Sequence, residues 1–263
     1  MGAPDISIWS LVAAFGLLAI PILVSLWLRL GIVAESVISL LRMAAQLTAA
    51  GFLLSKLFEY DRAWLNLIWL AVMMLVASLT TVQKSQLRLN RILVPVCVAT
   101  FSATLAITLY FNAFVVRIEN LFAARYAVVI GGMILGNVLA GNIISLTHFF
   151  ASLKDREERF LYFLGNGATL KDALLPFFRD ALIRALRPAL ARMATMGIVA
   201  LPGMMTGQML GGSNPMTAIK YQIAIMLAIF STQVLGMTLS IIFSCRIAFN
   251  EYGVLRREIF VKR

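Results

Sequence analysis

Long apolar runs without a charge are the feature that most constrains this sequence. Residues 6–28 contain 23 consecutive positions with no Asp, Glu, Lys or Arg, enough for an α-helix to cross roughly 30 Å of hydrocarbon. The chain is 61% hydrophobic and only 13% charged, whereas soluble domains are about one quarter charged. Because lipid offers no hydrogen bonds to an open backbone, apolar segments of this length cross a bilayer as helices. The pattern therefore predicts an all-α polytopic membrane protein.

Short polar loops divide the chain into about seven such spans within a single transmembrane domain, 1–263. One interval breaks the pattern: residues 154–192 form the only long charged segment. Its spacing of apolar and charged positions predicts a pair of amphipathic helices at the membrane surface, between the fifth and sixth spans. The alternative is a surface helix that serves only to attach the protein to lipid. The predicted spans are 6–28, 37–55, 63–83, 92–116, 126–150, 193–210 and 221–245.

The distribution of basic residues predicts the orientation of these spans. If the N-terminus lies outside, 17 of the 23 lysines and arginines fall on the inner side and only five on the outer side. Positively charged loops stay in the cytoplasm, so we expect a cytoplasmic C-terminus and a cytoplasmic 154–192 segment. The net charge of +11 is explained by this topology and by contact with membrane lipid, and we expect no binding of nucleic acid.

The segment 194–222 is apolar enough for a bilayer but is a poor helix. Pro202 removes a backbone donor, which breaks or kinks a helix, and Gly203, Gly207 and Gly211 recur at every fourth position. Transporters often place a substrate site at a helix broken at mid-membrane; the alternative is that the glycines only permit close packing. The residues that we expect on a translocation path here are Pro202, Met204, Met205, Gln208 and Gln222.

Three polar residues in other spans are further candidates for this path. Arg42 and Gln46 lie four residues apart in the second span and therefore share one helix face, and Asn137 lies in the fifth span. A charge inside a membrane helix costs a few kcal/mol and must face protein, water or headgroups. Alternatively, Arg42 extends its side chain to the cytoplasmic interface.

The sequence contains no enzymatic motif and no identifiable ligand set for a metal. Methionine thioethers near Pro202 suit soft metals, although methionine more often fills gaps in a core. There is no GxxxxGK[ST] motif, so the chain has no P-loop for ATP. The energy for active transport must then come from a partner ATPase or from an ion gradient. Two classes of function remain: an ATP-driven permease, or a self-contained gradient-driven carrier or membrane assembly protein.

Four segments carry a resemblance to a known family. LPGMMTGQML at 201–210 and NPMTAIKYQI at 214–223 closely resemble the signature of the iron-export ABC transporter permeases, and plant permeases linked to aluminium tolerance are similar there. GATLKDAL at 167–174 and RDALIRALRPAL at 179–190 match the family's cytoplasmic segment. The resemblance implies a non-enzymatic permease subunit of the plasma (inner) membrane that exports iron, a related metal or a small solute.

The same resemblance implies the partners and the coupling element. Two copies of the permease would pair with two copies of a separate cytoplasmic ABC ATPase, which binds the ATP, and the permease itself would hold no cofactor. ABC permeases dock on their ATPase through a helix that begins with a glutamate and is followed by Gly-Ala. The residues similar to that element are Glu157, Glu158, Gly165, Gly167, Ala168 and Thr169.

Overall fold

The computed structural model describes residues 6–250 and 253–261, and within them every regular element is a helix. Six of the described helical stretches are long and apolar enough to cross a bilayer, which confirms the predicted all-α polytopic fold. The helices are α1 (Ile8–Phe15), α2 (Ala19–Trp27), α3 (Val33–Tyr60), α4 (Ala63–Lys84), α5 (Leu89–Tyr110), α6 (Ala124–Asp155), α7 (Glu157–Gly165), α8 (Leu170–Thr195), α9 (Gly203–Leu210) and α10 (Pro215–Ala248).

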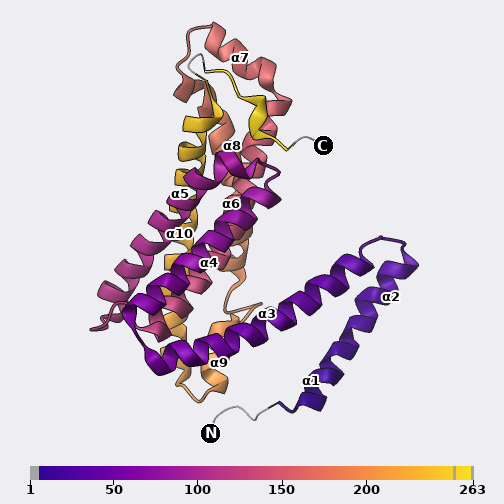
Figure 1. The fold of residues 1–263 in the computed structure, drawn as a ribbon, viewed down its shortest axis with the longest axis vertical. Helices are drawn as coiled ribbons and strands as arrows, with labels where there is room; N and C mark the ends of the chain where they lie inside the picture. The colour runs from indigo at the N-terminus through magenta and orange to yellow at the C-terminus, as the bar shows by residue number, and fades with distance from the viewer. Residues whose placement is uncertain (1–5, 251–252, 262–263) are drawn as a thin grey trace.

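Helices α4, α5, α6 and α10 form an upright bundle, with α8 packed along α6 (Figure 1). Small residues allow the close approach of these helices. A Cβ added at Gly141 of α6 would lie 2.9 Å from Met237 Sδ of α10, and one added at Gly131 would lie 2.7 Å from Leu70 Cδ1 of α4. Van der Waals contact of this kind is the main attraction between helices in lipid. A π-helical turn, Phe111–Val116, extends α5.

The region of the predicted sixth span differs from the prediction. Residues 193–210 are not one helix, because α8 runs from Leu170 to Thr195 and an irregular segment, 196–202, separates it from α9. The second helix of the charged segment and the start of the sixth span are therefore one continuous helix. Its buried stripe, which recurs at every fourth position, packs on α6 despite the surrounding arginines. That stripe consists of Ala173, Phe177, Ala181, Ala185 and Ala189.

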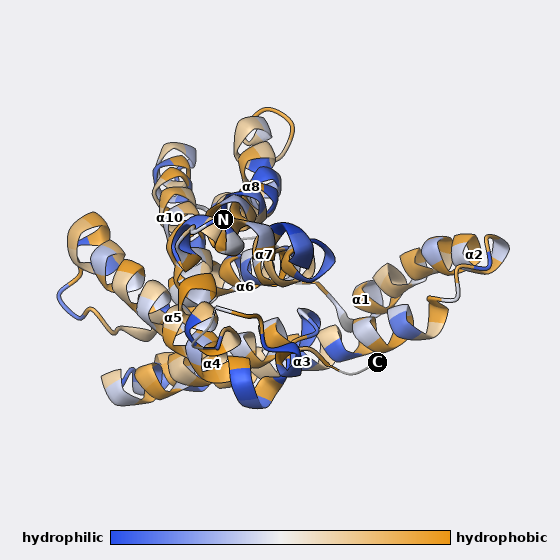
Figure 2. Ribbon diagram, turned by 90° about the horizontal axis from the view of Figure 1, so that it is seen from above, coloured by the Kyte–Doolittle hydropathy of each residue, from blue (hydrophilic) through white to orange (hydrophobic). Residues whose placement is uncertain are grey.

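The first three helices form an arm that projects from the bundle (Figures 1 and 2). The predicted span 6–28 is split by a 3-10 turn, Gly16–Leu18. Pro21 has no N–H for the carbonyl of Leu17, which explains why the α-helix is interrupted just before it. No residue in the most apolar stretch of α3 is buried, whereas half of those in α6 and α10 are.

A described part of the C-terminal tail folds back over one end of the bundle. The Arg88 N–H donates to the Ile259 carbonyl at 2.7 Å, and the Val261 N–H donates to the Gln86 carbonyl at 3.2 Å. Phe260 packs edge-on against Phe150. The tail and α7 therefore share one end of the molecule, and α9 lies at the other end (Figure 1).

Candidate coupling helix and translocation grooves

The local structure around α7 follows the sequence prediction. Glu157 and Glu158 occupy the first turn of α7, where carboxylates interact favourably with the helix dipole. The chain then turns at Gly167, whose φ of +86° favours glycine. The Thr169 hydroxyl accepts a hydrogen bond from the Asp172 N–H at 3.3 Å and caps α8. The two-helix charged segment is thus present, with a longer second helix than expected.

Aromatic packing fixes α7 to the bundle. Phe160 is 1% exposed, and its ring lies 6.4 Å from that of Phe177 in α8 and 5.7 Å from that of Phe249, next to the end of α10. The cluster also contains Phe149 of α6 and Ile259 of the tail. A force applied to α7 therefore acts on α6, α8 and α10 together.

The two candidate glutamates have different surroundings. Glu157 Oε2 accepts from Arg257 Nη2 at 3.0 Å, so it ties the tail to α7. Glu158 is exposed and forms no ion pair with any described residue. Beside it, Leu161 and Tyr162 are 42% and 68% exposed. Exposed large apolar side chains grouped on a charged helix are typical of a protein-binding surface.

The turn that follows α7 continues this surface. Gly165, Asn166, Gly167 and Thr169 are exposed, and Ala168 is half-buried. The Ala168 N–H donates to the Phe163 carbonyl at 3.1 Å and closes the turn against α7. Five of the six predicted coupling residues therefore lie at or near the surface with their backbone held in place, whereas Glu157 is already paired.

At the other end, α9 and the 196–202 segment border an apolar groove of about 470 Å³ against α10. Pro202, Met205 and Gln222, three of the residues that we expect on a translocation path, line it. Gln222 is 7% exposed. Its Nε2 lies 4.0 Å from Met196 Sδ, and its Oε1 has no partner among the described residues. The methionines at this groove are Met193, Met196, Met205, Met209 and Met226.

A more polar pocket of about 500 Å³ lies on the opposite side of α9. Met204 and Gln208 border it, together with Arg125, Tyr126 and Tyr221. The buried Gln208 Oε1 has no partner among the described residues. The guanidinium, phenol and amide groups can bind an anionic or hydrogen-bonding solute. Five of the predicted path residues therefore gather around α9.

The other three predicted path residues lie elsewhere. Asn137, in α6, donates through Nδ2 to the Met133 carbonyl at 2.9 Å, and its own carbonyl accepts from Gln233 Nε2 at 3.0 Å. The first bond lies within α6, and the second joins α10 to α6. Arg42 and Gln46 lie on the arm helix α3 and line neither of these two pockets. In the described part of the chain, no three His, Cys, Asp or Glu side chains lie close enough together to hold a metal ion.

Comparison with known proteins gives the family. The model of the uncharacterised protein family UPF0014 matches residues 8–249. This chain is a member of the UPF0014 family. The UPF0014 chain is 28% identical, over 99% of its own length and 98% of the relative's, to the probable iron export permease protein FetB of Escherichia coli. No solved structure matches it.

Two plant proteins are also similar to this chain. The membrane protein STAR2 of rice is 30% identical over 87% of this chain and 79% of its own. The protein ALUMINUM SENSITIVE 3 of Arabidopsis thaliana is 29% identical over 81% and 77%. Family membership and the six apolar helical stretches together make this UPF0014 chain a multi-pass membrane protein.

Proposed function

We propose that this UPF0014 chain is the permease subunit of an ATP-driven exporter of iron, a related metal or a small solute. Two copies would pair with two copies of a cytoplasmic ABC ATPase. The observation that carries the proposal is α7: a charged helix with exposed Leu161 and Tyr162, packed through Phe160 onto the membrane helices. Iron export, which the name of FetB gives as its function, supports the choice of cargo.

The path of coupling follows from the connection between α7 and the grooves. Phe160 joins α7 to α8, and α8 leads directly into the 196–202 segment and α9, which border the grooves. When the ATPases close on ATP, they would displace α7, and α8 would carry this displacement to the groove walls. Rigid-body movement of packed helices is a common form of such transmission.

The interior of the bundle favours a partner ATPase over an ion gradient. The buried polar residues of the described chain are Asn, Gln, Ser and Thr, and none of them is ionisable. Gradient-driven carriers commonly bury an ionisable residue on the ion path. The chain also lacks a P-loop of its own, so the ATP would bind to the partner.

The proposed location is the plasma (inner) membrane, with the α7 end in the cytoplasm and the start of α1 outside. The α7 end carries Lys154, Arg156, Arg159 and the basic tail residues Arg256 and Arg257. Positive charge of this kind is retained on the cytoplasmic side.

Proteoliposomes containing the permease and its co-purified ATPase test the proposal. We expect ATP-dependent movement of ferrous iron and ATP hydrolysis that depends on the permease. Tyr162→Arg should reduce both by at least tenfold, since a charge at the centre of a contact costs about 2 kcal/mol or more. Val254→Arg, at an exposed tail position of the same end, is the matched control.

Deletion of residues 154–169 is unsuitable as a test, because it would remove the buried Phe160. Transport driven by a pH or sodium gradient without ATP would contradict the proposal. So would wild-type ATP hydrolysis and transport in the Tyr162→Arg variant.

A further inference from the structure

The arm helix α3 carries a polar stripe that its own chain leaves uncovered. Glu35, Ser39, Arg42 and Gln46 are spaced by four, three and four residues, which puts them on one helix face. All four are exposed, and no described residue forms a hydrogen bond or ion pair with their side chains. A charged residue at membrane depth faces protein or water, because facing lipid costs several kcal/mol.

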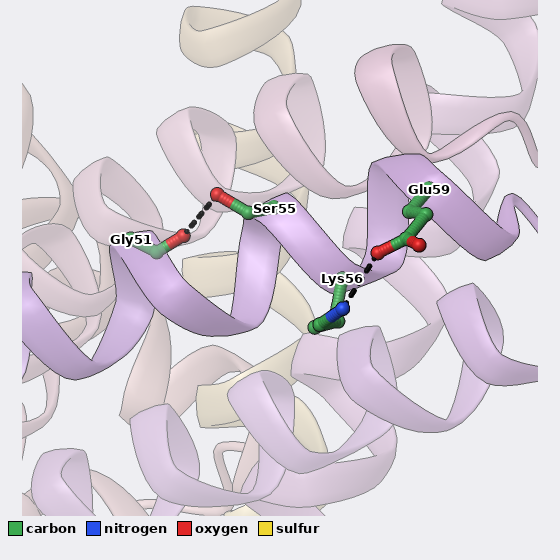
Figure 3. Close-up of polar contacts among 4 residues, drawn as sticks. All are labelled: Gly51, Ser55, Lys56 and Glu59. Carbon is green, nitrogen blue, oxygen red and sulfur yellow. Dashed lines mark hydrogen bonds and ion pairs between the residues drawn. The ribbon is translucent and has the colours of Figure 1, made fainter.

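Four other polar side chains of α3, those of Thr48, Ser55, Lys56 and Glu59, bond within the helix. Thr48 donates to the Ala44 carbonyl at 2.9 Å. Figure 3 shows Ser55 donating to the Gly51 carbonyl at 2.9 Å and Lys56 paired with Glu59 at 2.7 Å. The side chains of the polar stripe make no such bond, so at membrane depth they require a partner outside the arm.

A second surface of the same chain is also incomplete. Ile198 and Val199, in the irregular 196–202 segment, are 92% and 80% exposed. The segment borders a groove against residues 219–227 of the apolar helix α10. The backbone N–H groups of Ile198 and Leu201 donate no hydrogen bond to any described residue. Irregular backbone at membrane depth occurs only where protein or water covers it.

The start of α9 continues this surface through Gly203 and Gly207, which we call the glycine track because it has no side chains. A Cβ added at Gly203 or Gly207 would meet nothing within 4 Å, so the predicted glycine ladder does not serve packing within the chain. Glycines four residues apart let a second helix approach closely in a membrane. The track lies next to the 196–202 segment.

Within one copy, a contact between the arm and the bundle lies away from the polar stripe. The arm projects from the bundle (Figures 1 and 2). Its contacts with the bundle lie near the C-terminal end of α3, where Phe58 lies under the guanidinium of Arg125 of α6 at 6.0 Å. The polar stripe ends at Gln46, twelve residues before that contact.

We propose that two copies exchange arms, so that α3 of each copy lies across the 196–202 segment and glycine track of the other. This inference rests on the dimer of the proposed function and specifies its interface. Arg42 and Gln46 would donate to free backbone carbonyls of the 196–202 segment, and apolar neighbours of the stripe would enter the methionine-lined groove. The exchange is symmetric and closed, as expected of a two-fold dimer.

Cross-linking between two differently tagged copies tests the exchange in the assembled complex. The native cysteines Cys97 and Cys245, both free, are replaced by alanine. One copy carries Gln46→Cys and the other Ile198→Cys, and both are expressed with the ATPase. We expect a cross-linked product that contains both tags. Leu41→Cys in place of Gln46→Cys is the control, since this exposed residue lies about 140° around the helix.

The outcomes separate the interface from the function. Co-purification of both tags with the ATPase, but without the cross-link, means that lipid covers the arm; this would overturn the exchange and leave the proposed function intact. A cross-link within one copy, or equal cross-linking from position 41, also overturns it. If the two tags do not co-purify, the dimer itself is wrong.

Discussion

At the scale of single residues, the α7 end of the molecule contains side chains that hold α7 in place and side chains that face outward. Phe160 is 1% exposed, whereas its neighbour Tyr162, two positions on, is 68% exposed. A buried ring contributes mainly to stability, and an exposed ring contributes mainly to partner contact. Substitutions of Phe160 and Tyr162 should therefore affect different properties: the stability of the fold for Phe160 and the proposed coupling to the ATPase for Tyr162.

Phe160→Ala should destabilise the purified permease by about 3–5 kcal/mol, because it removes a buried ring between Phe177 and Phe249. Thermal unfolding in detergent measures this change. Tyr162→Ala is the matched control and should unfold like the wild type while stimulating the ATPase less. Equal melting temperatures of the two variants would contradict the assignment.

The neighbouring glutamates give a second comparison. Glu157→Gln breaks an ion pair with Arg257, whose side chain is 85% exposed, so stability should change by less than about 1 kcal/mol. Glu158→Gln should leave stability unchanged and weaken association with the ATPase, since Glu158 is free to contact a partner. Binding measured with immobilised permease checks this. Weaker association in the Glu157 variant alone would reverse our assignment.

At the scale of elements, the contact between α6 and α10 depends on small residues at the crossing. Gly141→Leu should destabilise the protein by about 1–3 kcal/mol, because its side chain would displace Gln233 and Met237 of α10. Gly136→Leu, in the same helix, meets open space and should have little effect. Unfolding in detergent measures the stability of both variants. Similar losses of stability would show that the contact between α6 and α10 is not closely packed.

The sequence predicted most elements because apolar runs of bilayer length leave few alternatives. The spans at 63–83 and 221–245 fall inside α4 and α10. The cap at Thr169 was also predictable, since a hydroxyl followed three residues later by Asp172 is a local signal. The arginines of α8 suggested a helix at the membrane surface, so the sequence did not predict that α8 packs along α6. The alanines at every fourth position, such as Ala181 and Ala185, were the available signal.

The tail and the arm were beyond sequence reasoning for a different reason. The tail is short, and its pairing of Ile259 with Arg88 is a long-range contact without a local pattern. Nothing in the sequence of α3 showed that Arg42 and Gln46 would not line the pocket that Gln208 borders. Of the candidate site, the gathering of Pro202, Met205 and Gln222 at one groove was predictable from the broken helix, because the next span returns alongside it.

At the scale of the whole molecule, α8 connects the two functional ends. It begins at the turn after α7 and ends at the 196–202 segment. A 26-residue helix is about 39 Å long, so one element extends from the proposed docking surface to the grooves. The account therefore predicts that the nucleotide state of the ATPase changes the exposure of groove residues.

Met209→Cys reports on this coupling, since Met209 borders the apolar groove. Its rate of reaction with a maleimide should change several-fold when the ATPase is trapped with ATP and vanadate. Val94→Cys, which is 68% exposed on α5, should react at a constant rate. A constant rate at position 209 in a complex that hydrolyses ATP would show that α8 does not transmit the movement.

The sidedness of α7 tests the central claim most directly, because an ATPase can drive this permease only from the cytoplasm. Asn166→Cys, at the exposed turn after α7, is treated in intact cells with a membrane-impermeant maleimide, with both native cysteines replaced. We predict reaction only after the cells are permeabilised, whereas Ser213→Cys, in the exposed turn after α9, should react at once. Labelling of position 166 in intact cells would contradict the account.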